Sequence, residues 1–596
     1  TLMGGSLIQA DTNGTIRLDN VLGTSVGNVL TLDNGAITVN ESDLSVNSVK
    51  NEGTFETTGT ILNVTNGLHN MGAMTLKGNS TVNAGELVSS GDLNIGDGTD
   101  ATKVGIVRDA DLSGTTTIGS GSSLAAGQTV TVTGQTTVNG ALSGKDIALN
   151  GSDAVVSGHD GRIEADRNLN AVSGSDLVMN GNSSVSAGND MNLEGLVSVD
   201  GSLAAGNNLN VTGDGTTLEG TVTVNGTTTV GGSLTVTDGD VTLNGTANVT
   251  DKTTVNGNGS LTLDSTGAGD LGNVTVNDDG SLTVNGNGNS VNADNITMNG
   301  NASGSISDTV LNLNGGRGEI ILNDASSLDI ANTTVNGSIS TTNTSSTDST
   351  HLGLDKVDIN GDLTVVGGDL VLSNDNTVSG SLNISDTVNV TVNDENGNPG
   401  TLVVKEGTLI DPNASLTIDE KSNFTSNVTM TGGSFTVNGN AEGNNFNGAI
   451  SFQPNDNLAY PGASSPVVTI NGTHNQNMGI TVDADASINV NGTLNINGTL
   501  SSGSNGDDTL SLNANGETGE IVINSTNEGF EDDIAIGGGT LVVNANEAIG
   551  KDGTLSVTGE GVTLKNTADG ATVSKDIATN GNGLTIQTDQ DFILAG

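Results

Sequence analysis

The sequence predicts an all-β protein built as an elongated parallel β-helix, also called a β-solenoid. Three observations indicate this fold: short segments in which apolar and polar residues alternate, the recurrence of similar segments at the spacing of one coil, and an aromatic content of 1%. Alternation with a period of two is typical of a strand with one buried face. No long window of the 596 residues has the helical period of 3.6.

The alternating segments share one phrase, in which a glycine and a small polar residue precede an apolar, a polar and a second apolar residue. It reads Gly-Ser-Leu-Thr-Val at 232–236 and at 280–284, and Gly-Thr-Leu-Asn-Ile at 492–496. Asn-Gly or Asp-Gly often follows, and these pairs favour turns. The phrase therefore predicts short strands that are bounded by turns and buried on one side.

The spacing of the segments suits one coil of a parallel β-helix. Leu234, Leu261 and Leu282 stand 27 and 21 residues apart, and the phrase at 184–189 returns 18 residues later. Steps of about 20 to 30 residues accommodate two or three short strands with their turns. We expect the three leucines to point inward on nearby coils, and Asn and Thr of successive coils to form hydrogen-bonded ladders.

A string of β-sandwich modules is the main alternative fold. The core of a sandwich usually contains large aromatic side chains. This chain has seven Phe, one Tyr and no Trp. The interior of a narrow solenoid can be filled by aliphatic side chains, so the composition favours the solenoid.

Charge and composition exclude several classes of partner and chemistry. The chain has 16 basic and 68 acidic residues, giving a formal net charge of −52. Nucleic-acid binding needs clustered Lys and Arg, so we expect no nucleic-acid partner. There is no Cys, and no apolar run long enough for a transmembrane helix. No charged-then-apolar leader follows Thr1, so we expect a mature or excised piece of a longer protein.

One segment has a different composition, and it suggests a division into three parts. We expect a solenoid over 1–398, an irregular segment or side module over 399–466, and a continued solenoid over 467–596. The middle segment holds all five prolines, which are disfavoured inside paired strands: Pro399, Pro412, Pro454, Pro461 and Pro466. It also holds most of the aromatic residues, which we predict to form a contact surface: Phe424, Phe435, Phe446, Phe452 and Tyr460.

The repeated phrases, above all Ser-Leu-Ala-Ala-Gly-Asn-Asn-Leu-Asn-Val at 202–211, resemble those of bacterial secreted β-helix surface proteins. That group comprises autotransporter passenger domains and filamentous-haemagglutinin-like exoproteins. The resemblance implies a long right-handed parallel β-helix that is exported across an outer membrane. It also implies an extracellular location at the bacterial cell surface and a role in adhesion, biofilm formation or host contact.

Catalytic patterns are weak. Gly-Thr-Ser-Val-Gly at 23–27 fits G-x-S-x-G, but that motif needs a strand–turn–helix context, and no helix is predicted there. The histidines, which we expect at turns or on the surface, have no zinc-ligand spacing: His69, His159, His351 and His474. The acidic clusters at 483–485 and 531–533 are expected to be solvated turns. We predict no catalytic residues, no cofactor-binding residues and no enzymatic activity.

Calcium is the one ion that the sequence suggests. Residues 503–510, Gly-Ser-Asn-Gly-Asp-Asp-Thr-Leu, approximate one copy of the calcium-binding β-roll repeat G-G-x-G-x-D-x-U. Carboxylate oxygens are suitable calcium ligands. Asp507 and Asp508 are therefore the candidate metal ligands.

Three functions remain open. The leading expectation is a non-enzymatic extracellular β-helical protein that acts in adhesion or as a structural filament. Its partner would be a receptor on a host or neighbouring cell, or another copy of itself. The alternatives are a calcium-dependent surface-layer or matrix protein and, less favoured, a glycan-processing β-helix enzyme. A lattice protein should assemble with calcium, an adhesin should bind a receptor, and an enzyme should have a groove lined by carboxylates and a base.

Overall fold

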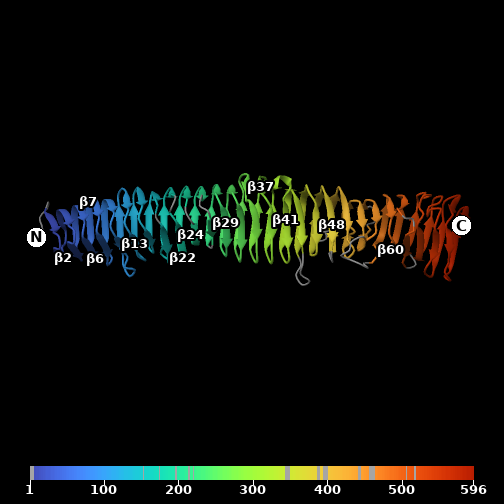
Figure 1. The fold of residues 1–596 in the computed structure, drawn as a ribbon, viewed down its shortest axis with the longest axis horizontal. Coiled ribbons are helices and arrows are strands. Elements are labelled where there is room, and N and C mark those ends of the chain that lie inside the picture. The colour runs from blue at the N-terminus through green and yellow to red at the C-terminus, as the bar shows by residue number, and fades with distance from the viewer. Residues whose placement is uncertain are drawn as a thin grey trace. The chain divides into compact units, whose positions relative to one another are not determined.

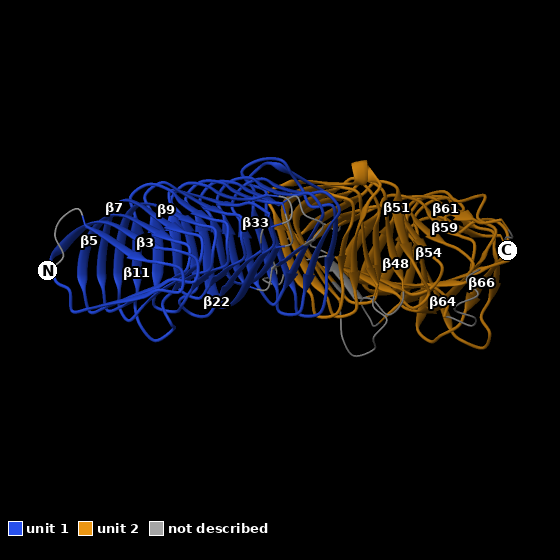
Figure 2. Ribbon diagram, turned by 60° about the vertical axis from the view of Figure 1, so that its left-hand side comes forward, with its two compact units in different colours: residues 1–292 blue, residues 293–596 orange. Residues whose placement is uncertain are grey.

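The computed structural model describes residues 6–151, 153–172, 175–194, 197–211, 215–218, 220–342, 350–385, 389–392, 400–439, 445–455, 464–504, 507–515 and 519–595. These residues form parallel β-strands stacked as a β-solenoid of about 26 turns, so the predicted fold is confirmed. In the described part of the chain, the only helical element is the short 3₁₀ turn η1 (Asn314–Gly316). The chain divides into two compact units, residues 1–292 and 293–596, coloured separately in Figure 2.

In unit 1, successive coils follow one another in chain order (Figure 1); the first coils repeat every two strands, as β5 pairs with β7, and the later ones every three strands. One coil consists of β29 (Ser233–Thr237), β30 (Asp240–Leu243) and β31 (Ala247–Val249). The next consists of β32 (Lys252–Asn256), β33 (Ser260–Asp264) and β34 (Gly269–Asp270). Each strand pairs in parallel with the equivalent strand of the next coil: β29 with β32, β30 with β33, and β31 with β34.

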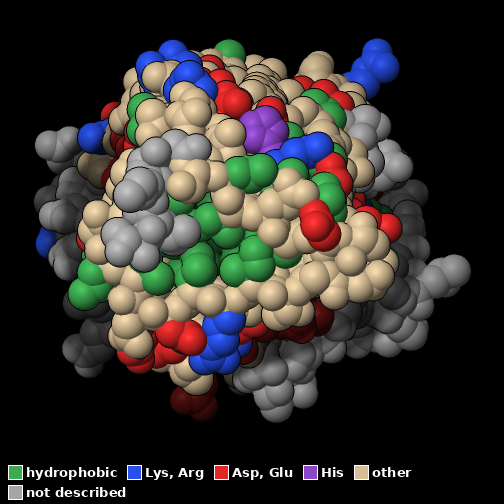
Figure 3. Space-filling view, turned by 90° about the vertical axis from the view of Figure 1, so that its left-hand side faces the viewer, with side chains coloured by type: hydrophobic (Ala, Val, Ile, Leu, Met, Phe, Trp, Pro, Cys, Tyr) green, Lys and Arg blue, Asp and Glu red, His purple; other side chains and the backbone are tan. Residues whose placement is uncertain are grey.

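The core of unit 1 is made by the apolar positions of the alternating phrase. Leu234, Leu261 and Leu282 are 2%, 0% and 0% exposed, as predicted. Leu261 lies opposite Val241 on the preceding coil and opposite Leu282 on β36 (Ser281–Asn285) of the following coil. Figure 3 views the molecule from the end where the N-terminus lies. Hydrophobic side chains gather at the centre of that face, and polar and charged ones surround them.

A buried polar ladder runs through four coils of unit 1. It joins the ends of β3 (Thr24–Thr31), β5 (Asp43–Asn51), β7 (Ile61–Asn70) and β9 (Thr81–Ser89). Thr31 Oγ1 donates to Asn51 Oδ1, Asn51 Nδ2 donates to Asn70 Oδ1 at 2.7 Å, and Asn70 Nδ2 donates to Ser89 Oγ at 2.9 Å. Thr31 is 1% exposed and the other three side chains are 0% exposed. Buried amides are tolerated when they are hydrogen-bonded, so this ladder confirms the predicted stacking of polar residues.

We expect Asn70→Ala to reduce the free energy of unfolding by about 2 kcal/mol, because it removes partners from the buried groups above and below it. The main-chain oxygen of Asp92, to which Asn70 Nδ2 donates at 2.9 Å, loses one of its two donors and keeps the N–H of Met74 at 2.8 Å. Urea unfolding followed by circular dichroism measures the change. Asn63→Ala on the outer side of the same strand is the matched control, since Asn63 accepts only an exposed bond from Asn83. Equal effects of the two substitutions would contradict a special role for the buried ladder.

Stacked glycines at one corner of unit 1 explain part of the unusual glycine content. A Cβ atom added at Gly72 would lie 2.1 Å from the main-chain oxygen of Gly53, and one at Gly91 would lie 2.0 Å from that of Gly72. The same contact recurs at Gly114 and Gly134, at 2.2 and 2.1 Å from the oxygen of the preceding glycine. Successive coils therefore approach too closely at this corner for any residue with a side chain.

The predicted side module over 399–466 is wrong for its described residues, which continue the coils of unit 2. β50 (Thr401–Val404), β51 (Gly407–Ile410) and β52 (Ser415–Ile418) pair in parallel with strands of the next coil. The sequence-based boundaries also differ from the observed division after residue 292.

The described prolines in this segment do not interrupt the sheets, because they lie outside the strands. Pro412 lies in the turn before β52, Pro454 follows β57 (Ile450–Phe452), and Pro466 precedes β58 (Val467–Gln476). Pro399 and Pro461 fall outside the described residues. Turns tolerate proline because no sheet hydrogen bond is lost there.

Candidate functional site

The four described aromatic residues of the predicted contact surface lie inside the solenoid. Phe424, Phe435, Phe446 and Phe452 are 1%, 0%, 3% and 0% exposed. The centroid of the Phe446 ring lies 5.9 Å from that of Phe424 and 5.0 Å from that of Phe435. The prediction that these side chains form an interface is therefore wrong, because they occupy inward positions and fill the core. Tyr460 falls outside the described residues.

His474 belongs to the same buried cluster, so the prediction that it lies at a turn or on the surface is wrong. It lies on β58, is 1% exposed, and its ring centroid is 5.8 Å from that of Phe446. Its Nε2 atom lies 3.2 Å from Gln476 Oε1, and its Nδ1 atom has no hydrogen-bond partner among the described residues. Burial lowers the pKa of His474 below the ordinary 6.5, and the Gln476 hydrogen bond opposes that shift.

This lowered pKa makes the stability of unit 2 sensitive to acid. Below pH 6.5 the unfolded chain binds a proton at His474 that the folded chain does not bind, so stability is lost as the pH falls. The loss should reach at most about 1.4 kcal/mol per pH unit. We expect His474→Gln to remove this part of the pH dependence between about pH 5 and 7 in urea unfolding. An unchanged pH profile would show that the pKa of His474 is the same in the folded and the unfolded chain, which would contradict the lowered pKa.

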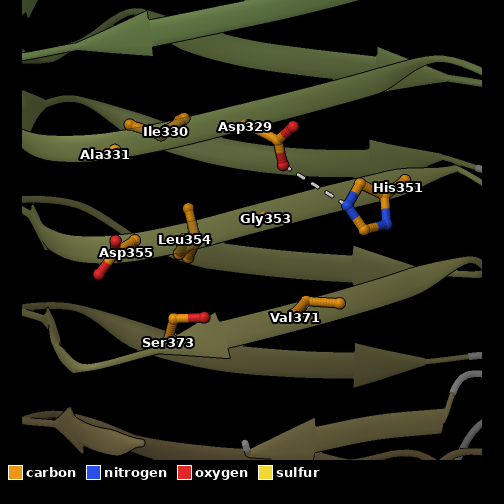
Figure 4. A pocket seen from close by; sticks show the side chains of 9 residues that line it. All are labelled: Asp329, Ile330, Ala331, His351, Gly353, Leu354, Asp355, Val371 and Ser373. Carbon is orange, nitrogen blue, oxygen red and sulfur yellow. Dashed lines mark ion pairs between the residues drawn. The ribbon is translucent and has the colours of Figure 1, made fainter. Parts of the chain in front are cut away.

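A shallow pocket of about 340 Å³ lies on an outer face of unit 2, shown in Figure 4. Asp329 projects from β42 (Ser327–Asn336) toward His351 on β44 (His351–Ile359), with 3.5 Å between Oδ1 and Nε2. A Cβ atom at Gly353 would lie 2.2 Å from Asp329 Oδ1, so glycine makes room for the carboxylate. The side chain of Asp329 is 72% exposed and that of His351 is 40% exposed, so water screens their charges. The pair therefore contributes little to stability.

The candidate calcium ligands Asp507 and Asp508 lie in an acidic corner of unit 2. We use this name for Asp483, Asp485, Asp507, Asp508, Asp532 and Asp533. They lie at the starts of three strands of consecutive coils: β60 (Ala486–Ile496), β62 (Thr509–Ala514) and β64 (Asp533–Gly538). Asp533 is the first residue of β64, and the other five lie just before a strand. The parallel pairing of β60 with β62 and of β62 with β64 stacks the three acidic turns.

Several of these carboxylates accept main-chain hydrogen bonds from neighbouring coils. Asp485 Oδ1 accepts from the N–H of Thr509 at 2.8 Å, and Asp533 Oδ1 accepts from that of Thr554 at 2.6 Å. Asp483 Oδ1 accepts from the N–H of Ser504 at 2.7 Å. Asp532 Oδ1 lies 3.4 Å from the nitrogen of Asp508, so that carboxylate is placed against the Asp508 backbone.

The electrostatic environment of Asp508 disfavours its charged form. Burial raises its pKa most, and the carboxylates of Asp532, Asp485, Asp483 and Asp507 raise it further. The Oδ2 atoms of Asp508 and Asp532 are buried and have no hydrogen-bond partner among the described residues. Asp532 is 0% exposed.

A buried lysine lies behind this corner. Lys575 is 0% exposed, and its Nζ atom lies 5.2 Å from the centroid of the Phe530 ring. Nζ donates to the main-chain oxygens of Asp532, at 2.8 Å, and Asp552. Burial lowers the pKa of Lys575 to about 8, against the opposing effect of nearby carboxylates, of which Asp533 has the largest.

Within the residues that the structure describes, no three acidic or histidine side chains are arranged so that they alone would hold a metal ion. The calcium assignment to Asp507 and Asp508 therefore stays a prediction. The same described residues contain no helix long and apolar enough to cross a membrane.

Comparison of the chain with protein-family models, with curated proteins and with solved structures gives no match. The β-solenoid fold agrees with the resemblance to β-helix proteins, while membership of the secreted surface families is a proposal.

Proposed function

We propose that this chain is a non-enzymatic extracellular β-helical protein of the bacterial cell surface, which acts in adhesion or as a structural filament. The observation that carries the proposal is the repetition of small polar side chains along the outer faces of both units. Such a surface offers the same hydrogen-bonding groups on coil after coil, so it suits extended contact with another surface better than it suits a single reaction centre.

One outer ladder of unit 1 lies on β21 (Leu169–Ala171), β23 (Met191–Leu193) and β25 (Leu209–Val211). Asn192 Nδ2 donates to Asn170 Oδ1, and Asn210 Nδ2 donates to Asn192 Oδ1, both at 2.7 Å. These three asparagines line a shallow groove of about 660 Å³ together with Ala148 and Thr229. The stacking holds each amide in one orientation, which lowers the entropy cost of binding a partner.

A second outer ladder, in unit 2, spans four coils. Asn497 donates to Asn477 at 2.9 Å, Asn524 donates to Asn497 at 2.8 Å, and Asn544 donates to Asn524 at 2.8 Å. These amides are neutral, whereas the chain as a whole has a formal net charge of −52. A receptor on a host or neighbouring cell that is neutral or cationic would meet the least repulsion at low salt.

The test is binding of the fluorescently labelled chain to cell surfaces and to immobilised chain, with electron microscopy of the purified protein. Adhesion or filament formation that persists in a chelator would support the proposal. An ordered array that forms only with calcium would instead favour the alternative, a calcium-dependent surface-layer or matrix protein, which the acidic corner supports. Catalytic turnover of a polysaccharide would contradict the proposal and favour a glycan-processing enzyme.

A further inference from the structure

The acidic corner of unit 2 contains two carboxylate oxygens whose burial is not compensated by any hydrogen bond. Asp483, Asp485 and Asp533 each bind a main-chain N–H through one oxygen. Asp532 also accepts one, from the N–H of Asp508 at 3.4 Å, but the Oδ2 atoms of Asp508 and Asp532 are buried without a hydrogen-bond partner among the described residues. Leaving a buried charged acceptor without a partner is costly, so such a pair of oxygens calls for a cation or a proton.

Lys575 does not donate a hydrogen bond to the unpaired Oδ2 atoms of Asp508 and Asp532. Its ammonium group donates to the main-chain oxygens of Asp532 and Asp552, and it faces the Phe530 ring on another side. A single lysine also supplies one positive charge against the six carboxylates of the corner. The Asp532 carboxylate, which is 0% exposed, is held against the Asp508 backbone by the contact at 3.4 Å.

We propose that the acidic corner binds one Ca²⁺ ion between the carboxylates of Asp508 and Asp532, with water and main-chain oxygens completing the coordination. Oxygen-only ligands favour calcium or magnesium over the transition metals, and calcium tolerates irregular geometry better than magnesium does. Asp507, which the sequence suggested as a ligand, is exposed and is not required. This inference concerns one site of unit 2 and does not depend on the proposed adhesive function.

The experiment is amide hydrogen exchange of the full chain at constant ionic strength, after treatment with a chelator, with Ca²⁺ raised to about 10 mM. Two such ligands suit a dissociation constant on the order of 10⁻⁴ to 10⁻³ M, as in extracellular calcium modules. We expect exchange to slow in β62 and β64 as Ca²⁺ is added. Mg²⁺ at the same concentration should have a smaller effect.

Three variants separate this site from diffuse binding of cations to an acidic protein. Asp508→Asn should abolish the calcium-dependent slowing, and so should Asp532→Asn. Asp507→Asn removes the same charge from the neighbouring exposed residue and should leave the effect intact. Asp532 is buried next to Lys575, so Asp532→Asn can prevent folding. In that case Asp508→Asn alone decides the test. The calcium site is wrong if the wild-type chain does not respond, if Asp507→Asn and Asp508→Asn weaken the response equally, or if Mg²⁺ acts as well as Ca²⁺.

A shared proton is the competing explanation for the unpaired oxygens. If acidification without calcium slows exchange in β62 and β64, while calcium at neutral pH does not, the two carboxylates hold a proton and the calcium site is overturned. The readout requires no partner or cell, so failure of the calcium site and failure of the adhesive function are distinguishable.

Discussion

Leu261→Asp should reduce the free energy of unfolding of the coils around it by about 4 kcal/mol or more, because it buries an unpaired charge in a dry aliphatic stack. Leu261 is 0% exposed and lies between Val241 and Leu282 of the neighbouring coils. Solenoid coils stabilise one another through their interfaces, so the loss should spread to adjacent coils. Limited proteolysis and hydrogen exchange of β30, β33 and β36 measure it.

The matched control is Thr262→Asp, one residue further along the same strand. Thr262 is half-buried on the outer side and pairs with Thr242 and Thr283. The same new charge should therefore change stability by less than about 1 kcal/mol. If Leu261→Asp left proteolysis around β33 at the wild-type rate, the inward assignment of Leu261 would be wrong.

Phe435→Ala should cost about 3 to 5 kcal/mol, the range for deletion of a buried aromatic side chain that leaves a cavity. The Phe435 ring contacts that of Phe446 at 5.0 Å and that of Phe424 at 6.3 Å, both with edge-on geometry. Urea unfolding of the chain, monitored by amide hydrogen exchange in β55 (Ser434–Asn438), measures the loss of unfolding free energy.

Phe435→Leu provides the comparison, because it keeps the site apolar and removes less volume. We expect it to cost less than half as much as the alanine substitution. A surface role for Phe435 would give the opposite result, with little effect of either substitution on unfolding.

The fold could be predicted because the two periods that define it are visible in the sequence. Period-two alternation identified the strands, and the spacing of Leu234, Leu261 and Leu282 identified the coils. Coil length varies from 18 to more than 20 residues, since turns differ in length while strands remain in register. The exact assignment of strands to sheets therefore required the structure.

Composition alone predicts the wrong position for the phenylalanines, whereas the alternating pattern predicts the right one. Residues 433–437 read Gly-Ser-Phe-Thr-Val, which is the recurring phrase with Phe435 in the position of leucine. That match already indicated an inward side chain. The clustering of proline and aromatic residues suggested a module instead, but the described prolines lie in turns between strands.

The acidic corner could be predicted only in part. Asp485, Asp508 and Asp532 are separated by 23 and 24 residues, close to one coil, so their stacking was available from the sequence. The sequence could not predict that Asp532 is buried, that its Oδ2 atom has no hydrogen-bond partner among the described residues, or where Lys575 lies. These features depend on the orientation of the side chains at the corner.

Successive coils stack in parallel with one register, and a pair of introduced cysteines tests that register directly. The chain has no cysteine, so introduced pairs can be read without background. Thr242 and Thr262 lie opposite each other on β30 and β33, on the outer side. Adjacent strands are about 4.8 Å apart, within the Cα separation that a disulfide accepts.

Thr242→Cys with Thr262→Cys should form a disulfide under mild oxidation. Asn244→Cys with Ser260→Cys should not, since Ser260 lies opposite Asp240, and an offset of four residues separates the pair by about 13 Å. Disulfide formation in the first pair alone would confirm the parallel register. A disulfide in the second pair, or none in the first, would contradict it.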